Sequence, residues 1–250
     1  MQLAPMSLLP DIIDTQADVG SLADSLLDLP TNPPSLYVDI EGVNLSRHGT
    51  VSILQIYVLP TDRTYLVDIY TLKGAAFTTG GSRGQSLKQI FESVGIPKAF
   101  FDIRNDSDAL YSHFGINVAG IVDIQLMELA TRTGSKRCIN GLARCMERGE
   151  ASMSYTEKAR WAENKEAGRK LFAPERGGSY EVFNVRPMPE NIKQYCMQDV
   201  KYLPRLWQRY DAKLTPLWRG KVERATLDRI NLSQSATYNG QGRHMALGPW

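Results

Sequence analysis

The sequence contains few cysteines, no long apolar run and little net charge. Its three cysteines show no C-x-x-C spacing, which argues against a disulfide framework and against a zinc site. Because no run of about 18 apolar residues is present, we expect no membrane-spanning helix. The opening MQLAPMSLLPDIIDTQ carries prolines and acids and no basic stretch, so we expect no secretory signal. These absences predict an intracellular protein, cytoplasmic or nuclear.

The charge is small overall but unevenly distributed along the chain. The formal net charge is +2, whereas residues 131–186 hold twelve Lys and Arg against seven Asp and Glu. A basic segment beside a more acidic remainder suits a polyanionic substrate that is held near a cation-binding centre. On charge alone, a solvated helical surface explains the same segment equally well.

The spacing of apolar residues predicts a mixed sheet with helices on both of its faces. The first three β-rich runs have short links between them, which is typical of an antiparallel meander. Beyond them, helical and strand patterns alternate. The expected strands are 35–44, 51–59, 64–72, 98–103 and 120–125, and the expected helices are 86–95, 106–115 and 126–134.

The second half of the chain reads as mostly helical, with one irregular stretch. Residues 134–189 are basic and partly helical, and they end in a loop rich in Gly and Pro. One long helix is expected over 190–214. We therefore predict a main domain over 1–213, with a helical lead-in, and a tail over 214–250 that begins helically and becomes extended.

Two carboxylates interrupt the first apolar strand. Side chains alternate along a strand, so Leu36, Val38 and Ile40 share one face, while Asp39 and Glu41 share the other. Burying two like charges side by side is costly unless a cation lies between them. The pair therefore indicates either a cation site or an exposed strand.

Two further acids extend this pattern. Asp199 lies in the apolar stripe of the late helix, with Tyr195 one turn before it on the same side. Asp106 starts a mid-chain helix and points inward with Leu110. Taken singly, each acid has a structural explanation, an ion pair with arginine or a helix N-cap. Taken together, four convergent carboxylates form the oxygen cage that Mg²⁺ or Mn²⁺ prefers.

This ordered set resembles the DEDD superfamily of 3′–5′ exonucleases, in its tyrosine-using subgroup. The motifs are DIE at 39–41, DIRNDSDALYSHFG at 102–115 and YCMQD at 195–199. The flanks EGVNLSRHGTVSILQI, LFAPERGGSYEVF and VRPMP are similar to stand-alone, ribonuclease D-like proteins of the fungal type. The resemblance covers about residues 10–210. It implies an α/β, ribonuclease H-like fold, with a mixed five-stranded sheet flanked by helices.

The resemblance also implies a reaction. The chain would remove nucleotides from the free 3′ end of single-stranded RNA or DNA, with RNA favoured, and would release nucleoside 5′-monophosphates by means of two Mg²⁺ or Mn²⁺ ions. The alternative is a non-catalytic RNA-binding adaptor on the same fold, in which the acidic residues of the site would have been lost. The metal ligands implied are Asp39, Glu41, Asp106 and Asp199, and the residue implied to orient the attacking water is Tyr195.

Other residues are candidates for contact with the substrate. Val43 and Asn44 follow the D-x-E motif and would line the 3′-terminal nucleotide, although a plain strand-to-loop role explains them as well. Lys165 and Arg186 would contact phosphates, and Trp161 would stack on a base. For these three, a solvated surface or a core position is the competing interpretation.

Overall fold

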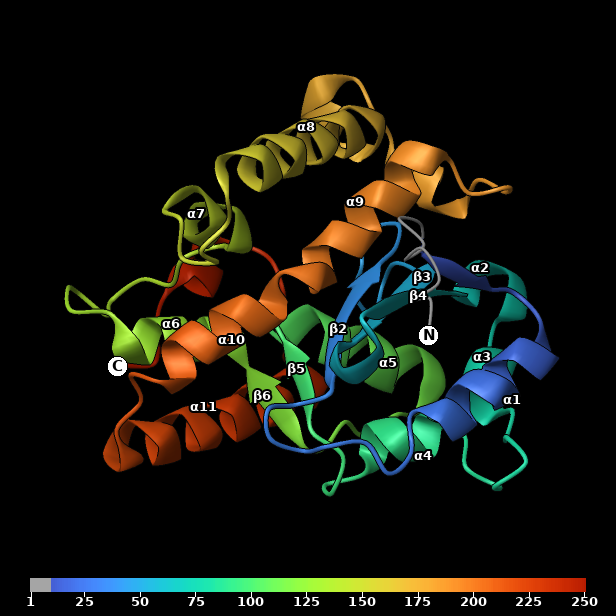
Figure 1. The fold of residues 1–250 in the computed structure, drawn as a ribbon, viewed down its shortest axis with the longest axis horizontal. Helices are drawn as coiled ribbons and strands as arrows, with labels where there is room; N and C mark the ends of the chain where they lie inside the picture. The colour runs from blue at the N-terminus through green and yellow to red at the C-terminus, as the bar shows by residue number, and fades with distance from the viewer. Residues whose placement is uncertain (1–9) are drawn as a thin grey trace, which may run out of the picture.

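The computed structural model describes residues 10–250, which form an α/β fold around one sheet (Figure 1). The strand order in the sheet is β1-β4-β3-β2-β5-β6. Strands β2, β3 and β4 pair antiparallel, as the meander predicted, and all other neighbours pair parallel. The strands are β1 (Asp11–Ile13), β2 (Leu36–Glu41), β3 (Ile53–Val58), β4 (Arg63–Asp68), β5 (Lys98–Phe100) and β6 (Ile121–Asp123).

The predicted fold class is confirmed, but the predicted number of five strands is wrong. The sheet has a sixth strand, β1, which pairs parallel with β4 and places Asp11 opposite Tyr65. Three residues are too few to show the alternation by which a strand is recognised in a sequence. Strand β1 is therefore defined by its pairing with β4 and not by its own pattern.

Helices cover both faces of the sheet. The core on one face includes side chains of α1, α3, α4 and α5, and the core on the other includes those of α6, α9 and α10. No helix within residues 10–250 is both long enough and apolar enough to cross a membrane. The helices are α1 (Gln16–Ser25), α2 (Ile69–Leu72), α3 (Ala75–Thr78), α4 (Leu87–Glu92), α5 (Arg104–Phe114), α6 (Ile124–Thr131), α7 (Leu142–Glu147), α8 (Tyr155–Phe172), α9 (Glu190–Lys201), α10 (Leu203–Asp211) and α11 (Pro216–Gln234).

The single helix expected over 190–214 is wrong in its middle. The chain forms α9 and α10, with a break at Tyr202. Pro204 lies in the first turn of α10. Proline has no backbone N–H, so it fits the first turn of a helix but would remove a hydrogen bond from a helix interior. The break separates the part of the segment that reaches the centre of the sheet, α9, from the part that packs beside α6.

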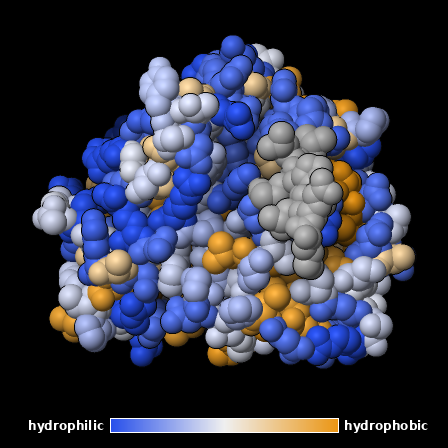
Figure 2. Space-filling view, viewed as in Figure 1, coloured by the Kyte–Doolittle hydropathy of each residue, from blue (hydrophilic) through white to orange (hydrophobic). Residues whose placement is uncertain are grey.

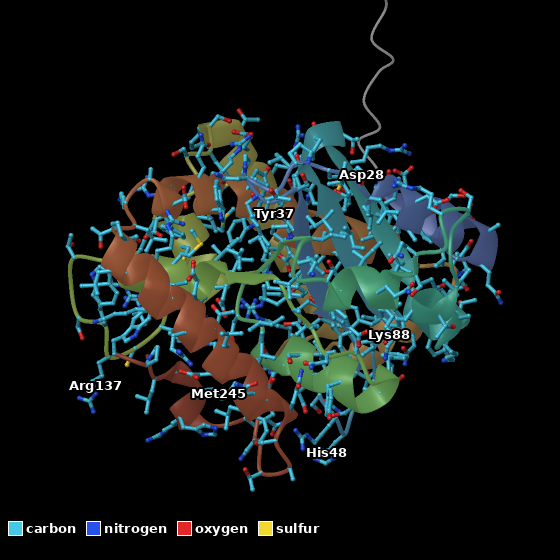
Figure 3. The ribbon with its side chains drawn as sticks, turned by 90° about the horizontal axis from the view of Figure 1, so that it is seen from below. Asp28, Tyr37, His48, Lys88, Arg137 and Met245 are labelled. Carbon is cyan, nitrogen blue, oxygen red and sulfur yellow. The ribbon has the colours of Figure 1, made fainter. Side chains whose placement is uncertain are left out.

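The predicted tail begins with α11, which packs against α5 and α6 (Figure 3). Beyond α11, the chain turns back across the body. Cys138 and Leu247 form an isolated antiparallel bridge, and the Trp250 ring packs edge-on against Trp218 at 5.1 Å. The division of the chain at residue 213 stays a prediction, because α11 shares its packing with helices of the main domain.

The buried carboxylate of Asp123 joins three helices. It caps the start of α6 by accepting the backbone N–H groups of Gln125 at 3.0 Å and Leu126 at 3.2 Å. It also accepts the N–H of Ile103, directly before α5, at 3.3 Å. Arg229 of α11 donates to it at 2.7 Å, and both side chains are buried. One carboxylate thereby sets where α5 begins relative to α6 and α11.

Replacing Asp123 by alanine should lower the free energy of unfolding by about 3–5 kcal/mol, because it leaves the Arg229 charge buried without its closest partner. Urea unfolding would measure the loss. The matched control is Asp211→Ala, which breaks the exposed pair with Arg219 and should cost at most about 1 kcal/mol. Equal losses in the two variants would contradict the role given to Asp123.

Candidate active site

Three of the predicted ligands converge near the end of β2. Asp39 and Glu41 lie on the face of β2 that α9 covers, and Asp199 projects from α9. One carboxylate oxygen of each residue lies within 4.8 Å of the other two. Helix α9 comes this close because Ile192 and Cys196 are buried against the sheet. The alternation along β2 and the helical period of α9 therefore place the three acids together, as predicted.

Asp106 of α5 lies outside the group of three whose oxygens are within 4.8 Å of one another, but near enough to Asp39 for that charge, after burial, to raise its pKa. Its side chain is buried, and its Oδ1 atom has no hydrogen-bond partner among residues 10–250. The N-cap explanation of this residue is wrong, because α5 begins at Arg104 and Asp106 lies within the helix. Asp108 faces another way, and its Oδ1 accepts from Arg47 Nε at 2.7 Å. A buried oxygen without a partner is costly, and a bound cation would satisfy it.

One lysine lies among the carboxylates. Lys165 of α8 donates from Nζ to both carboxylate oxygens of Asp199, each at 2.8 Å, and to the Tyr195 hydroxyl at 3.1 Å. Its side chain is mostly buried, so water screens this pair only weakly. One ammonium group offsets one negative charge, and it leaves the cluster of four acids with a net excess of negative charge.

The pKa values of Asp39, Glu41 and Asp106 reflect their burial and this excess of charge. Burial, and then repulsion by Asp199, raises the pKa of Asp39 to about 7. Burial and neighbouring carboxylates likewise raise the pKa values of Glu41 and Asp106 well above their usual range. All the donors are oxygens, which suits hard cations such as Mg²⁺ or Mn²⁺. The residues therefore fit a divalent-cation site, and their assignment as ligands remains a prediction.

Tyr195 is held between α8 and the sheet. Its side chain is buried, its ring packs edge-on against Phe172 at 5.0 Å between centroids, and Lys165 Nζ lies 4.3 Å from its ring centre. Burial, followed by repulsion from Asp199 and Glu41, raises the pKa of Tyr195 well above its ordinary value. The phenol therefore keeps its proton at neutral pH and offers a hydroxyl group, not a phenolate, to the cluster.

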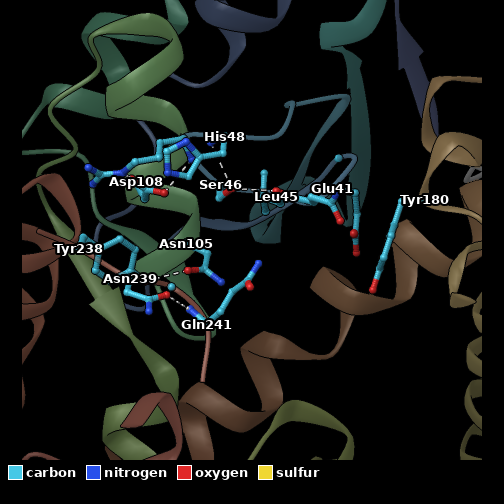
Figure 4. A pocket seen from close by; sticks show the side chains of 14 residues that line it. Glu41, Leu45, Ser46, His48, Asn105, Asp108, Tyr180, Tyr238, Asn239 and Gln241 are labelled. Atoms are coloured by element: carbon cyan, nitrogen blue, oxygen red, sulfur yellow. Dashed lines mark hydrogen bonds and ion pairs between the residues drawn. The ribbon is translucent and has the colours of Figure 1, made fainter. Parts of the chain in front are cut away.

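A cavity of about 490 Å³ adjoins the cluster at Glu41 (Figure 4). Asn44 lines this cavity, and its contact with the substrate stays a prediction; Tyr180 borders the cavity from the segment before α9. Val43 instead closes the neck of the 42–50 loop, where it exchanges hydrogen bonds with Thr50. The volume lies within the range of about 300–1,000 Å³ that is typical of small-molecule sites.

Two other candidate substrate residues have partners inside the protein. Arg186 forms two hydrogen bonds of 2.6 Å with the carboxylate of Asp68, which tie the chain before α9 to β4. Trp161 is buried in the core formed with Met146. Substrate contact by Arg186 stays a prediction, although its guanidinium is already used in this pair. Lys165 belongs to α8, and the surface around this helix is mostly hydrophilic in the view of Figure 2.

Several residues that line the cavity were not predicted from the sequence. Arg47, Asn105 and Gln241 line the cavity, as do Tyr238 and Asn239 of the tail. The tail is polar and aperiodic there, so hydrophobic spacing carries no information about where it lies. Asn105 stands directly before Asp106, but only the three-dimensional arrangement shows that it faces the cavity.

Comparisons with known proteins identify relatives of the chain. The piRNA biogenesis protein EXD1 of Mus musculus is 29% identical over 178 residues, which cover 67% of this chain and 27% of that protein. Human EXD1 is 29% identical over 177 residues, which cover 67% and 30%. The chain therefore spans less than a third of the length of these relatives.

Solved structures share the fold at low sequence identity. Trypanosoma brucei RNase D in complex with RNA U12 has a TM-score of 0.73 at 20% identity, covering 94% of this chain and 75% of that one. Escherichia coli RNase D has a TM-score of 0.57 at 16% identity, covering 91% and 51%. A family model described as 3′–5′ exonuclease matches residues 10–215. This chain belongs to the 3′–5′ exonuclease family of the DEDD superfamily, as its three motifs predicted.

Proposed function

We propose that the chain is a metal-dependent exonuclease that removes nucleotides one at a time from the 3′ end of a single strand. The observation that carries this proposal is the convergence of Asp39, Glu41 and Asp199, with Asp106 beside them and one of its oxygens unpartnered. RNA is the favoured substrate, because RNase D structures share this fold and one of them was solved in complex with RNA. The proposed residence is intracellular, cytoplasmic or nuclear.

In this proposal the four acids hold two divalent cations. When bound, such ions activate the attacking water and stabilise the leaving oxygen of a phosphodiester. The chain's own residues arrange the reactants. Tyr195 keeps its proton, so its hydroxyl can orient a water molecule by hydrogen bonding but does not remove a proton from it. Lys165 lies within hydrogen-bond reach of both Tyr195 and Asp199, where it can contact the phosphate that is cleaved.

The cavity beside Glu41 would take the terminal nucleotide. Asn44 lines this cavity, so the strand end and its loop would carry the nucleoside while the acids face the phosphate that joins it to the strand. Cleavage of the bond between this phosphorus and the 3′ oxygen of the preceding nucleotide releases a nucleoside 5′-monophosphate. Single strands are favoured because a terminal base that enters the cavity cannot stay paired with a second strand.

A non-catalytic adaptor remains the second candidate, and one observation favours it. The Lys165 ammonium already forms an ion pair with Asp199, and a protein that had lost its metals could use such a lysine to neutralise part of the cluster. The catalytic proposal is preferred because all four acids are retained and one lysine cannot balance them. The two candidates differ in whether metal ions matter for the working protein.

The position of Tyr195 depends on a glycine in α8. A Cβ atom built on Gly168 would lie 2.6 Å from Cδ2 and 2.8 Å from Cβ of Tyr195, closer than van der Waals contact permits. These atoms belong to the base of the side chain and to its ring, so a rotamer change cannot relieve the clash. Gly168 thus sets the distance between α8 and α9.

Metal ions should stabilise the wild-type protein and support cleavage. Mg²⁺ or Mn²⁺ at about 100 times its Kd should add about 2.7 kcal/mol to the free energy of unfolding. A 5′-labelled single strand should shorten from its 3′ end, and a chelator should stop the shortening. Asp106→Asn should lose both effects, whereas the exposed Asp28→Asn should keep them. Nucleic-acid binding that is indifferent to chelator, without cleavage, would favour the adaptor instead.

Tyr195→Phe removes one hydroxyl group and keeps the packed ring. If that hydroxyl orients the water, the rate of cleavage should fall by about 10²–10⁴-fold, while the affinity for an uncleaved strand should change little. Single-turnover kinetics and a binding titration separate the two effects. An unchanged rate would leave Tyr195 with a packing role only.

Gly168→Ala should destabilise the protein, because overpacking costs about 1–3 kcal/mol and exceeds the gain in helix propensity. Gly220→Ala is the matched control, since it also lies within a helix but has no atom within 4 Å of the added Cβ. That control should stabilise the protein by about 0.5–1 kcal/mol. Thermal unfolding would show the two shifts, and a shift in the same direction would argue against close packing at Tyr195.

A further inference from the structure

The chain beyond α11 forms the outer wall of the cavity beside Glu41. The family match ends at residue 215, so Tyr238, Asn239 and Gln241 lie outside it. All three line the same cavity as Glu41 (Figure 4). The cavity is thus built partly by the region that the family model matches and partly by a segment beyond it.

Arg47 fastens this segment to the loop that follows the D-x-E motif. Its Nη2 atom donates to the carbonyl oxygens of Ser233 at 2.8 Å and Ser235 at 2.9 Å. Its Nε atom and its backbone N–H both donate to the Asp108 carboxylate, at 2.7 and 2.8 Å. Arg47 therefore connects the loop, α5 and the end of α11 through its backbone N–H and its Nε and Nη2 atoms.

A second attachment lies directly beside the acids. The Tyr238 hydroxyl donates to Asn105 Oδ1 at 2.7 Å. The backbone at Gly240 lies so close that a Cβ atom there would be 2.3 Å from the same oxygen. Asn105 immediately precedes Asp106. The segment from Ser235 to Gln241 is consequently held against the first turn of α5.

The groups that this wall presents are amides and phenols. Asn239 Oδ1 accepts the backbone N–H of Gln241 at 2.9 Å, which folds the segment so that Gln241 extends into the cavity near Asn105. The Gln241 side chain is exposed and makes no hydrogen bond within residues 10–250. An amide both donates and accepts, so it matches the edge of a nucleobase, whereas a phosphate would call for free cations.

We propose that Gln241 reads the base of the 3′-terminal nucleotide. This inference rests on the proposed function, because it assumes that the terminal nucleotide occupies the cavity beside Glu41. The segment Ser235–Gln241 is then a specificity element: Tyr238 and Gly240 position it, and the Gln241 amide hydrogen-bonds the edge of the base. A single strand can turn its last base toward this wall, since the base is not paired. The enzyme consequently discriminates among 3′-terminal bases.

The test uses four oligonucleotides that differ only in their 3′-terminal base, and the four nucleoside 5′-monophosphates. Wild type, Gln241→Ala and the control Arg243→Ala are compared by KM and kcat for removal of the first nucleotide, and by calorimetric binding of the monophosphates. Arg243 is exposed two residues beyond this segment and does not line the cavity. Gln241→Ala should weaken binding of the preferred base by about 3–10-fold, the value of one hydrogen bond, and should reduce the differences among the four bases. Arg243→Ala should match wild type.

Three results would overturn the inference. They are equal behaviour of Gln241→Ala and wild type, an equal loss for all four bases, and faster cleavage by Gln241→Ala, which would make the segment a barrier to the substrate. The proposed function fails separately. If wild type cleaves no strand with metal present but still binds monophosphates with a preference that Gln241→Ala removes, then the exonuclease proposal is wrong and the wall is a nucleotide-binding site.

Discussion

Repulsion among four neighbouring carboxylates, two of them buried and two half-buried, is the constraint on which the arrangement of this protein depends. Burial and then repulsion by neighbouring carboxylates raise the pKa values of Asp39, Glu41 and Asp106, so the surrounding structure must hold these acids together. Strand β2 does so for two of them because it is paired with β3 over its whole length and with β5 at its start. The Asp123–Arg229 pair does so for the helix that carries Asp106. Strand pairing and this ion pair thus hold the acids in place against their mutual repulsion.

The sequence predicted the parts of the site that follow from periodicity. A period of two put Asp39 and Glu41 on one face, and a helical period put Asp199 toward the sheet. It did not predict β1, which is defined only by pairing, or the break at Tyr202. It gave Lys165 as a phosphate contact but not its pairing with Asp199, which lies on another helix. Such contacts depend on how helices pack, and local spacing does not encode them.

Asp106 and Asp108 lie on one turn of α5 but have different roles. Asp106 has one oxygen without a hydrogen-bond partner in the described part of the chain, whereas both oxygens of Asp108 accept hydrogen bonds from Arg47. The same arginine binds the end of α11, so the framework acid also determines where the outer wall begins. Loss of this ion pair would therefore disturb the wall of the cavity before it disturbed the acids. Arg47 thus supports both the helix that carries Asp106 and the outer wall of the cavity.

The wide separation of the acids along the chain has a consequence for folding. The cluster draws on Asp39, Asp106 and Asp199, which are brought together only when β2, α5 and α9 have all docked. Contacts between positions so distant along the chain form slowly, because closing long loops costs entropy before any packing repays it. A fragment or a partly folded chain that lacks any one of these segments cannot assemble the cluster. The acids therefore come together only in the completely folded chain.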